Sequence, residues 1–147
     1  MEEIFKMIVK QIDIDQFEEY VYNAFIDDSK LLEFYDRSLH AKTTEEAIEN
    51  VIFKIQNSYP DANIFGVEIE NTKVGYFVCK ENLLISFGMA IKYRNKMVLS
   101  KFWEEIKNKL GNKFNSLLYS HNIRAIEFLK KGGMKILFDH ITVLSYN

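Results

Sequence analysis

The middle of the chain decides the fold: residues 63–91 read NIFGVEIENTKVGYFVCKENLLISFGMAI. In its first part, apolar side chains alternate with polar or small ones, which is the period of two that a half-buried strand shows. Short polar groups at Asn71–Lys73 and Glu81–Asn82 interrupt the apolar runs. Short polar turns between apolar strands are typical of an antiparallel meander. The stretch therefore predicts three consecutive strands, at 63–70, 74–80 and 83–91.

Upstream of this meander, a first strand is expected at 4–12 and is followed by a helical pattern. Asp13 is placed to cap a helix. Apolar residues then recur three or four positions apart from Phe17 to Phe25, which is the spacing of one helical face. The polar group Asp27–Ser29 breaks this pattern, so the first helix is expected to end before it.

Two more helices are expected before the meander. The first is short and covers residues 30–36. The second begins after Thr43, because Thr43 and Glu46 have the spacing of a capping box. It ends before Pro60, since the residue preceding a proline is pushed out of helical geometry.

Downstream of the meander, helices and strands alternate. A stripe of apolar residues up to Leu110 predicts a helix that begins near Met97 and is capped by Gly111. Asn122 is placed to cap a further helix. The last apolar stretch, 134–146, forms either one long strand or two short ones. The expected elements after the meander are helix, strand, helix and strand, at 97–110, 114–119, 122–131 and 134–146.

Composition places the chain among small globular proteins. Its 147 residues suit one domain over 1–147, and 48% of them are hydrophobic. The single cysteine, Cys79, lies in an apolar run and is expected to be a buried thiol without a disulfide or a metal ion. The amino terminus is acidic, and no apolar run approaches the roughly 18 residues of a membrane span. These features predict a cytoplasmic protein.

Charge is unevenly distributed around a net value of −2. Residues 1–91 hold 8 Lys and Arg against 17 Asp and Glu, whereas residues 92–131 hold 10 against 3. A basic segment can attract phosphates and an acidic surface can attract amines, although ordinary solvated faces carry such charge too. The basic residues are spread over helix, strand and loop without a recognised nucleic-acid motif. Nucleic-acid binding is therefore not favoured.

Two segments turn this order of elements into a family likeness. Residues 89–99 read MAIKYRNKMVL, and residues 122–134 read NIRAIEFLKKGGM. The first resembles the pyrophosphate loop of the GNAT acetyltransferases, an Arg or Gln followed by two glycines between a strand and a long helix. The second resembles their Asn-x-x-Ala…Tyr-x-x-x-Gly-Phe segment. The resemblance covers nearly the whole chain and implies an α/β (α+β) fold with a central, mostly antiparallel mixed sheet flanked by helices.

The resemblance further implies that acetyl-CoA or another acyl-CoA is a substrate. The start of the helix near Met97 supports this, because the first N–H groups of a helix have no intrahelical partner and attract phosphate. Three nearby cations, including Lys92, add to that attraction. The residues implied in binding are Met89, Ile91, Arg94, Asn95, Lys96, Met97, Val98, Leu99, Asn122 and Phe128.

The chain departs from the family pattern at three positions. Met97 and Leu99 stand where the family has glycines, which let the backbone approach the pyrophosphate without a Cβ in the way. If both side chains point away from the cleft between the fourth and fifth strands, coenzyme A can enter; if they fill the cleft, it cannot. Leu129 stands at the position of the family's Tyr, whose hydroxyl resembles a general acid for the leaving thiolate. Leucine has no proton to donate.

Other residues are candidates for the missing chemistry. By sequence, Tyr119, Ser120 and His121 are the nearest candidates for a general acid. Glu68 is a candidate base, because its strand in a GNAT fold would run close to the acceptor site, although such residues are usually on the wet face of a strand. The resemblance also implies that the fourth strand splays from the fifth, and that exposed N–H groups of Phe87–Ile91 hold the pantetheine and the thioester oxygen.

Two functions are expected from these features. The first is an acyl-CoA-dependent N-acyltransferase, whose acidic amino-terminal half would suit a cationic amine acceptor. The second is a catalytically degenerate binding or structural protein. With Leu129, the second segment looks like that of GNAT-like proteins of tailed bacteriophages, which would place the protein in the host cytoplasm or in the virion with a virion partner. A homodimer is also open, since the apolar strand at 136–146 could pair with the edge of a second copy.

Overall fold

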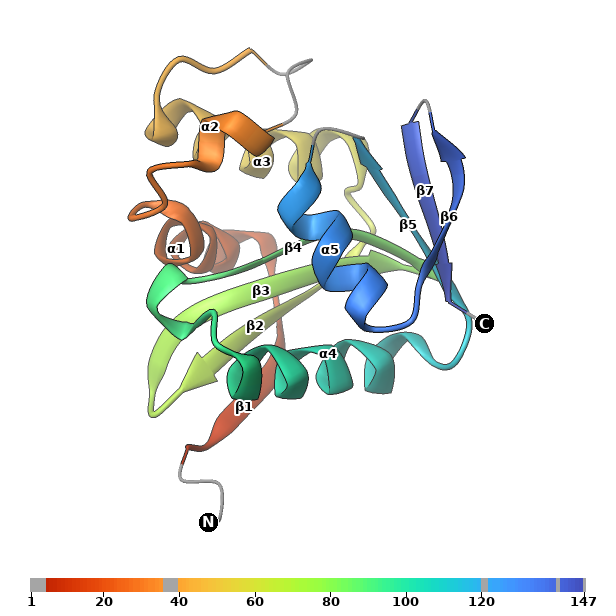
Figure 1. The fold of residues 1–147 in the computed structure, drawn as a ribbon. Helices are drawn as coiled ribbons and strands as arrows, with labels where there is room; N and C mark the ends of the chain where they lie inside the picture. The colour runs from red at the N-terminus through yellow and green to blue at the C-terminus, as the bar shows by residue number, and fades with distance from the viewer. Residues whose placement is uncertain (1–4, 36–39, 120–121, 140, 147) are drawn as a thin grey trace.

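The structure is a computed structural model that describes residues 5–35, 40–119, 122–139 and 141–146. Its centre is a seven-stranded sheet in the order β1-β2-β3-β4-β5-β7-β6. Helices cover both faces of this sheet (Figure 1). The sheet is mixed, because β4 and β5 run parallel whereas the other neighbouring strands pair antiparallel. The fold class expected from the sequence is confirmed.

The first four strands contain the predicted meander, and β1 pairs with its outer strand β2. The turn between β2 and β3 is tighter than predicted, because Glu70 and Asn71 both have positive φ, the geometry of a two-residue hairpin. The fourth strand is shorter than predicted, because Ile91–Tyr93 form a 3₁₀ turn. The bounds are β1 Met7–Ile12, β2 Asn63–Ile69, β3 Thr72–Lys80 and β4 Leu83–Met89.

The carboxy-terminal strands are β5 Phe114–Tyr119, β6 Lys135–Asp139 and β7 Ile141–Tyr146. The stretch at 134–146 thus forms two strands, and Gly133, with a φ of 103°, completes the turn that leads from α5 into the first of them. β7 lies between β5 and β6 and has strand partners on both sides. The expectation that the whole stretch could offer an edge is therefore wrong for β7; of the two strands in this stretch, only β6 lies at an edge of the sheet.

The helices begin where the sequence places their caps. The Asp13 carboxylate accepts an amide N–H of the first turn of α1 at 3.1 Å, and the Thr43 hydroxyl does the same for α3 at 3.1 Å. Asn95 and Asn122 cap α4 and α5 in the same way. None of the described helices is long and apolar enough to cross a lipid bilayer. The bounds are α1 Ile14–Phe25, α2 Leu31–Phe34, α3 Thr44–Ser58, α4 Lys96–Leu110 and α5 Ile123–Lys131.

Two hydrophobic cores lie on opposite faces of the sheet. Along β3, Phe77 belongs to the core under α4 and α5, whereas its neighbours Tyr76 and Val78 belong to the core under α1 and α3. This alternation follows from the two-residue period of a strand. Cys79 is buried in the first core, and burial raises the pKa of its thiol. The predicted buried cysteine is confirmed.

Candidate active site

β4 and β5 run side by side only at their beginnings. Their parallel ladder consists of two pairs, Leu83 with Asn115 and Leu84 with Ser116. The Ser116 hydroxyl donates a hydrogen bond to the Leu84 carbonyl at 3.0 Å. Just beyond, Ile85 is an extra residue of β4 opposite β3, and a bulge of this kind bends a strand. Past Leu84 the two strands separate, which confirms the splay that the family resemblance implied.

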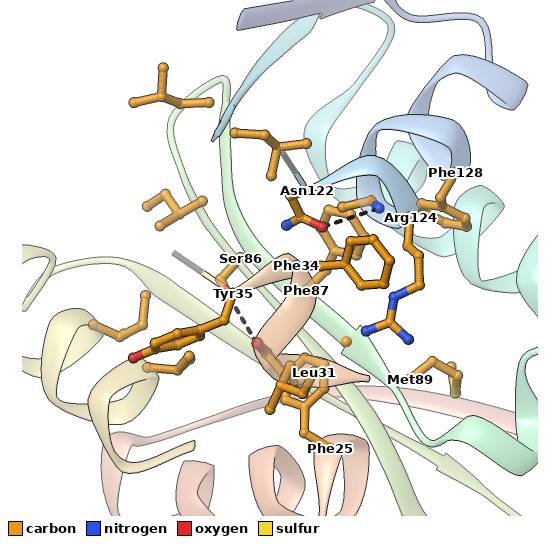
Figure 2. A pocket seen from close by; sticks show the side chains of 18 of the residues that line it. Phe25, Leu31, Phe34, Tyr35, Ser86, Phe87, Met89, Asn122, Arg124 and Phe128 are labelled. Carbon is orange, nitrogen blue, oxygen red and sulfur yellow. Dashed lines mark hydrogen bonds between the residues drawn. The ribbon is translucent and has the colours of Figure 1, made fainter. Parts of the chain in front are cut away.

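The gap opens into a cavity of about 540 Å³, part of which Figure 2 shows. Its lining residues come from both hydrophobic cores, so the cavity passes through the sheet. We name its two halves after the helices behind them. The α4 side is formed by Met89, Leu99, Phe102 and Phe128. The α1 side is formed by Leu31, Tyr35, Val51, Ile55, Tyr59 and Tyr76.

β4 forms the wall between the two halves. Phe87 packs against Phe128 on the α4 side, with ring centroids 5.3 Å apart. A Cβ at Gly88 would lie 2.5 Å from Phe25 Cζ and 2.9 Å from Tyr76 Cε1, so only glycine allows α1 to pack this closely. The β4 backbone past the short ladder has no strand partner on its β5 side. Its N–H groups at the gap are therefore available to a ligand.

A pair of hydroxyl groups lies on the cavity wall. The Tyr76 hydroxyl and Ser86 Oγ are 2.8 Å apart and are hydrogen-bonded, and both residues line the cavity. Burial raises the pKa of Tyr76 far above its usual value, so the phenol keeps its proton at neutral pH. The pair is a proton-carrying group that the sequence analysis did not single out.

A buried ionic cluster joins the elements around the cavity. Asp28, in the connection after α1, has a fully buried side chain and pairs with Arg124 through both carboxylate oxygens, at 3.0 and 2.8 Å. Arg94 contacts the same carboxylate at 2.9 Å and also donates to the Met89 carbonyl at 2.7 Å. Burial alone would raise the pKa of Asp28, but the hydrogen bonds and charges of Arg124 and Arg94 outweigh it and hold that pKa below its ordinary value.

The predicted phosphate loop keeps an open cleft. Met97 is 56% exposed and is not part of the cavity lining, whereas Leu99 forms part of the α4 side without closing it. Of the two outcomes left open by the sequence, neither is met in full: Met97 lies outside the cavity, as the open-cleft outcome requires, whereas Leu99 lines the cavity but leaves space in it. Val98 is buried, and its amide is taken by the Asn95 side chain at 3.0 Å. By the geometry of a helix start, the amides of Lys96 and Met97 have no intrahelical partner.

The other predicted binding residues divide between wall and surface. Met89, Asn122 and Phe128 line the cavity. Ile91 is exposed in the 3₁₀ turn and does not line it. Arg94 lines the cavity, but its guanidinium is committed to Asp28 rather than directed at solvent. Asn122 also caps α5, accepting an N–H at 3.4 Å.

Leu129, at the position of the family's Tyr, does not reach the cavity. Its side chain is fully buried in the core under α4 and α5. The preceding residue, Phe128, faces the cavity instead. The second half of α5 therefore presents the Phe128 ring to the cavity, next to the position where the family resemblance implied a hydroxyl.

The predicted catalytic residues are not brought together at the cavity. Glu68 is part of β2, and its carboxylate lies between side chains of β1 and α1. Lys10 of β1 binds it at 2.8 Å, and the Tyr20 hydroxyl of α1 donates a hydrogen bond to it at 2.7 Å. These partners lower its pKa, the hydrogen bond from Lys10 most, which weakens it as a base. Tyr119 ends β5, but its side chain, like Ser120 and His121, lies outside the described part of the structure.

The most conspicuous polar feature of the site was missed by sequence reasoning. Asp28 was interpreted only as part of a helix-breaking group, and Arg124 only as a variable position in the second segment. They are 96 residues apart in the chain, so no local sequence pattern predicts their contact. Within the described residues, no group of three or more His, Cys, Asp or Glu side chains is placed to hold a metal ion.

The splayed mixed sheet with helices on both faces is the GNAT acyl-CoA N-acyltransferase fold. An acetyltransferase from Thermus thermophilus superposes with a TM-score of 0.69 at 12% identity, over 95% of this chain and 96% of that one. The PaiA N-acetyltransferase from Thermoplasma acidophilum, solved with coenzyme A, gives 0.59 at 15% identity, over 97% and 99%.

An aminoglycoside N(6′)-acetyltransferase from Legionella pneumophila gives a TM-score of 0.60 at 16% identity, over 98% of this chain and 92% of that one. No protein-family model and no curated protein sequence matches the chain. At these identities the likeness establishes the fold, and the activity has to be argued from the site.

Proposed function

We propose that the protein is an acyl-CoA-dependent N-acyltransferase that acts on an amine. One observation carries this proposal: the cavity passes through the sheet at the gap between β4 and β5. Two substrates can then enter from opposite faces and meet beside the free backbone of β4. A group transfer between two bound molecules needs such a shared space, because holding the reactants together removes much of the entropic barrier.

The residues around the gap suit an acyl-CoA. The free amides of Lys96 and Met97, the positive end of the α4 dipole and the exposed ammonium groups of Lys92 and Lys96 favour a pyrophosphate. The apolar α4 side suits the pantetheine arm, and β4 amides near Gly88 can bind its carbonyl groups. Arg94 is held by Asp28, so phosphate binding rests on the helix start and the lysines.

The chemistry assigned to this chain is positioning more than proton transfer. The amine nitrogen forms a bond to the acyl carbon, the carbon–sulfur bond breaks, and the electron pair of that bond leaves on sulfur. The amine nitrogen loses a proton to water, and the sulfur takes up a proton. Backbone N–H groups of β4 stabilise the negative charge that develops on the acyl oxygen. The Tyr76–Ser86 pair can pass a proton at the wall. Because Leu129 supplies no general acid, turnover is expected to be slower by a factor of about 10²–10⁴ than that of an enzyme that has one at this position.

Calorimetric titration with acetyl-CoA and desulfo-CoA tests the proposal, with the melting temperature followed in parallel. Micromolar affinity and a rise in melting temperature are expected, since a ligand that binds only the folded state stabilises it. Release of free thiol in the presence of amines then measures transfer. If neither ligand binds at millimolar concentration, the proposal is wrong.

A second candidate is a GNAT-fold protein that binds without catalysing, in a phage virion or a host cytoplasm. Two observations favour it: Leu129 is buried in the core, and Arg94 is held in an ion pair away from solvent. Binding of desulfo-CoA without thiol release from any amine would support this candidate. Turnover with an amine would exclude it.

A further inference from the structure

The α1 side of the cavity offers a ligand mainly apolar and aromatic surface. Leu31, Val51 and Ile55 contribute aliphatic groups, and Tyr35, Tyr59 and Tyr76 contribute rings. Each ammonium or hydroxyl group moved into such a space leaves water and needs a hydrogen-bond partner there. A polyamine or a sugar would move many such groups at once, whereas a ring-sized apolar body gains free energy from burial.

The charge on the cavity wall is positive. Its described lining residues include the guanidinium groups of Arg94 and Arg124 and no carboxylate. Asp28 is fully buried and already bound to two guanidinium groups, so this cluster of three residues keeps a net charge of +1. The acidic amino-terminal half of the sequence suggested a cationic acceptor, but the described wall offers a second ammonium group no carboxylate.

Arg124 is the cation best placed to meet a ligand. It pairs with Asp28 through two of its N–H groups, and its guanidinium lies over the Phe34 ring at 4.5 Å from the centroid. Its side chain remains 34% exposed, and Figure 2 shows it reaching from α5 toward Phe34. A guanidinium has five N–H donors, so fixed donors remain for a further acceptor. A carboxylate is the group that such a planar donor binds best.

We infer that the acceptor is a small amine that carries both an apolar, ring-sized body and a carboxylate, as an aromatic α-amino acid does. The inference rests on the proposed N-acyltransferase activity and specifies its second substrate. The body fills the α1 side, and the carboxylate pairs with Arg124. The amine nitrogen is then held near β4, where an acyl group is available.

The same surroundings favour the reactive form of the nitrogen. An apolar environment and nearby cations both disfavour an ammonium ion and lower the pKa of the bound amine. More of the amine is then neutral and nucleophilic at neutral pH. The absence of a carboxylate base from the described lining is consistent with this arrangement, because the proton can leave to water before the attack.

Four amines separate the two recognition elements. L-Phenylalanine has body and carboxylate, phenethylamine lacks the carboxylate, glycine lacks the body, and spermidine has only ammonium groups. With acetyl-CoA as donor, we expect kcat/KM for L-phenylalanine to exceed that for phenethylamine by roughly tenfold. This ratio corresponds to the free energy of one charge-assisted hydrogen-bonded pair. The kcat/KM for L-phenylalanine should exceed the kcat/KM for glycine by roughly tenfold or more, because burying an aromatic side chain contributes a free energy of that magnitude. Spermidine should be the poorest of the four.

Two variants assign these preferences to residues. Arg124→Gln should bring the ratio of L-phenylalanine to phenethylamine close to one, and Val51→Phe, which fills the α1 side, should reduce the ratio of L-phenylalanine to glycine. Lys130→Gln, on the exposed face of the same helix, is the control and should keep both ratios. Each ratio is measured on a single variant, so it does not depend on how much of that variant is folded.

The outcomes distinguish this inference from the proposed function. If desulfo-CoA binds and spermidine is a better substrate than L-phenylalanine, the acceptor inference is overturned while the activity stands. If desulfo-CoA does not bind, the activity fails, and calorimetry of L-phenylalanine against phenethylamine on the protein alone still decides the inference. A ratio that survives Arg124→Gln unchanged overturns the role of Arg124.

Discussion

The two sides of the cavity are built by different means. On the α4 side, the features available to a ligand are mostly backbone: free amides at the start of α4 and the unpaired edge of β4 beside Gly88. On the α1 side, they are side chains, mainly aromatic and aliphatic, from α2, α3 and β3. On the α4 side, Leu129 is buried in the core, at the position where the family resemblance implied a hydroxyl, and the backbone groups of β4 and of the start of α4 remain.

This difference bears on how each side tolerates substitution. Backbone amides survive the replacement of most side chains, so under the proposed function the acyl-CoA is held by amides although Met97 and Leu99 are not glycines. Recognition of the second substrate depends on the side chains themselves. Under the proposed function, substitutions on the α1 side are therefore the ones expected to change the choice of acceptor.

Asp28 connects the two sides, and its loss should have the largest effect. It comes from the connection after α1 and holds Arg94 and Arg124, at the starts of α4 and α5. Asp28→Asn removes one partner of a buried cluster and should lower the free energy of unfolding by about 3 kcal/mol, measured by urea denaturation. Asp27→Asn, at its exposed neighbour, should change it by less than about 0.5 kcal/mol. Equal effects would contradict the role of the cluster.

The same carboxylate should leave a signature in acid. Its pKa in the folded protein lies below the ordinary value of about 3.9 expected for the unfolded chain. Its stabilising contribution is therefore complete above about pH 4 and is lost as the pH falls through the lower folded pKa. The difference in unfolding free energy between the parent protein and Asp28→Asn should shrink below about pH 4. A difference that stays constant down to pH 2 would show that the charge of Asp28 is not what stabilises the fold.

The α4 side can be tested by placing a hydroxyl at two adjacent positions. Leu129→Tyr forces a larger side chain into a fully buried site and should lower the unfolding free energy by about 1–3 kcal/mol without raising kcat. Phe128→Tyr places its hydroxyl at the cavity wall and should change stability by less than about 1 kcal/mol. Thiol-release kinetics and urea denaturation of both variants check this contrast. A higher kcat for Leu129→Tyr would show that position 129 reaches the reacting atoms.

The smallest effect is expected at the outer end of the α4 side. Lys96→Gln removes an exposed charge from the first turn of α4 and should weaken desulfo-CoA binding by about two- to fivefold at low salt. Added salt should reduce the effect, because exposed charges are screened. The control is Lys113→Gln, an exposed lysine beyond the other end of α4. If both variants bind alike, the start of α4 does not hold the phosphates.

The features that the sequence predicted well are those specified by neighbouring residues. Asp13, Thr43 and Asn122 each cap a helix through an N–H three residues ahead, so the signal and its consequence lie within one turn. The succession of strands along the chain likewise followed from the apolar periods and the polar turns between them. The turn at Glu70–Asn71 was predicted one residue too late. Both residues have positive φ, but neither is a glycine, so the sequence did not indicate this backbone geometry.

The parts of the site that could not be predicted depend on contacts between distant segments. Arg94 was interpreted as a phosphate ligand from its position in a basic loop, yet a buried carboxylate 66 positions earlier in the chain holds it. The Tyr76–Ser86 pair depends on the register of β3 against β4, which a bulge shifts. Glu68 occupies the predicted strand, but the side chains around it give it an ion pair instead of a place at the cavity.

The two-pair ladder between β4 and β5 is also the shortest strand pairing in the sheet. The strands on either side of it, β1 to β4 and β5 to β7, are joined within each group by longer antiparallel ladders. Between the two groups, side chains supply most of the contact: the core under α4 and α5 contains Phe77 of β3 and Phe114 of β5, and Asp28 binds Arg124 of α5. The width of the gap therefore depends on these side-chain contacts more than on backbone hydrogen bonds.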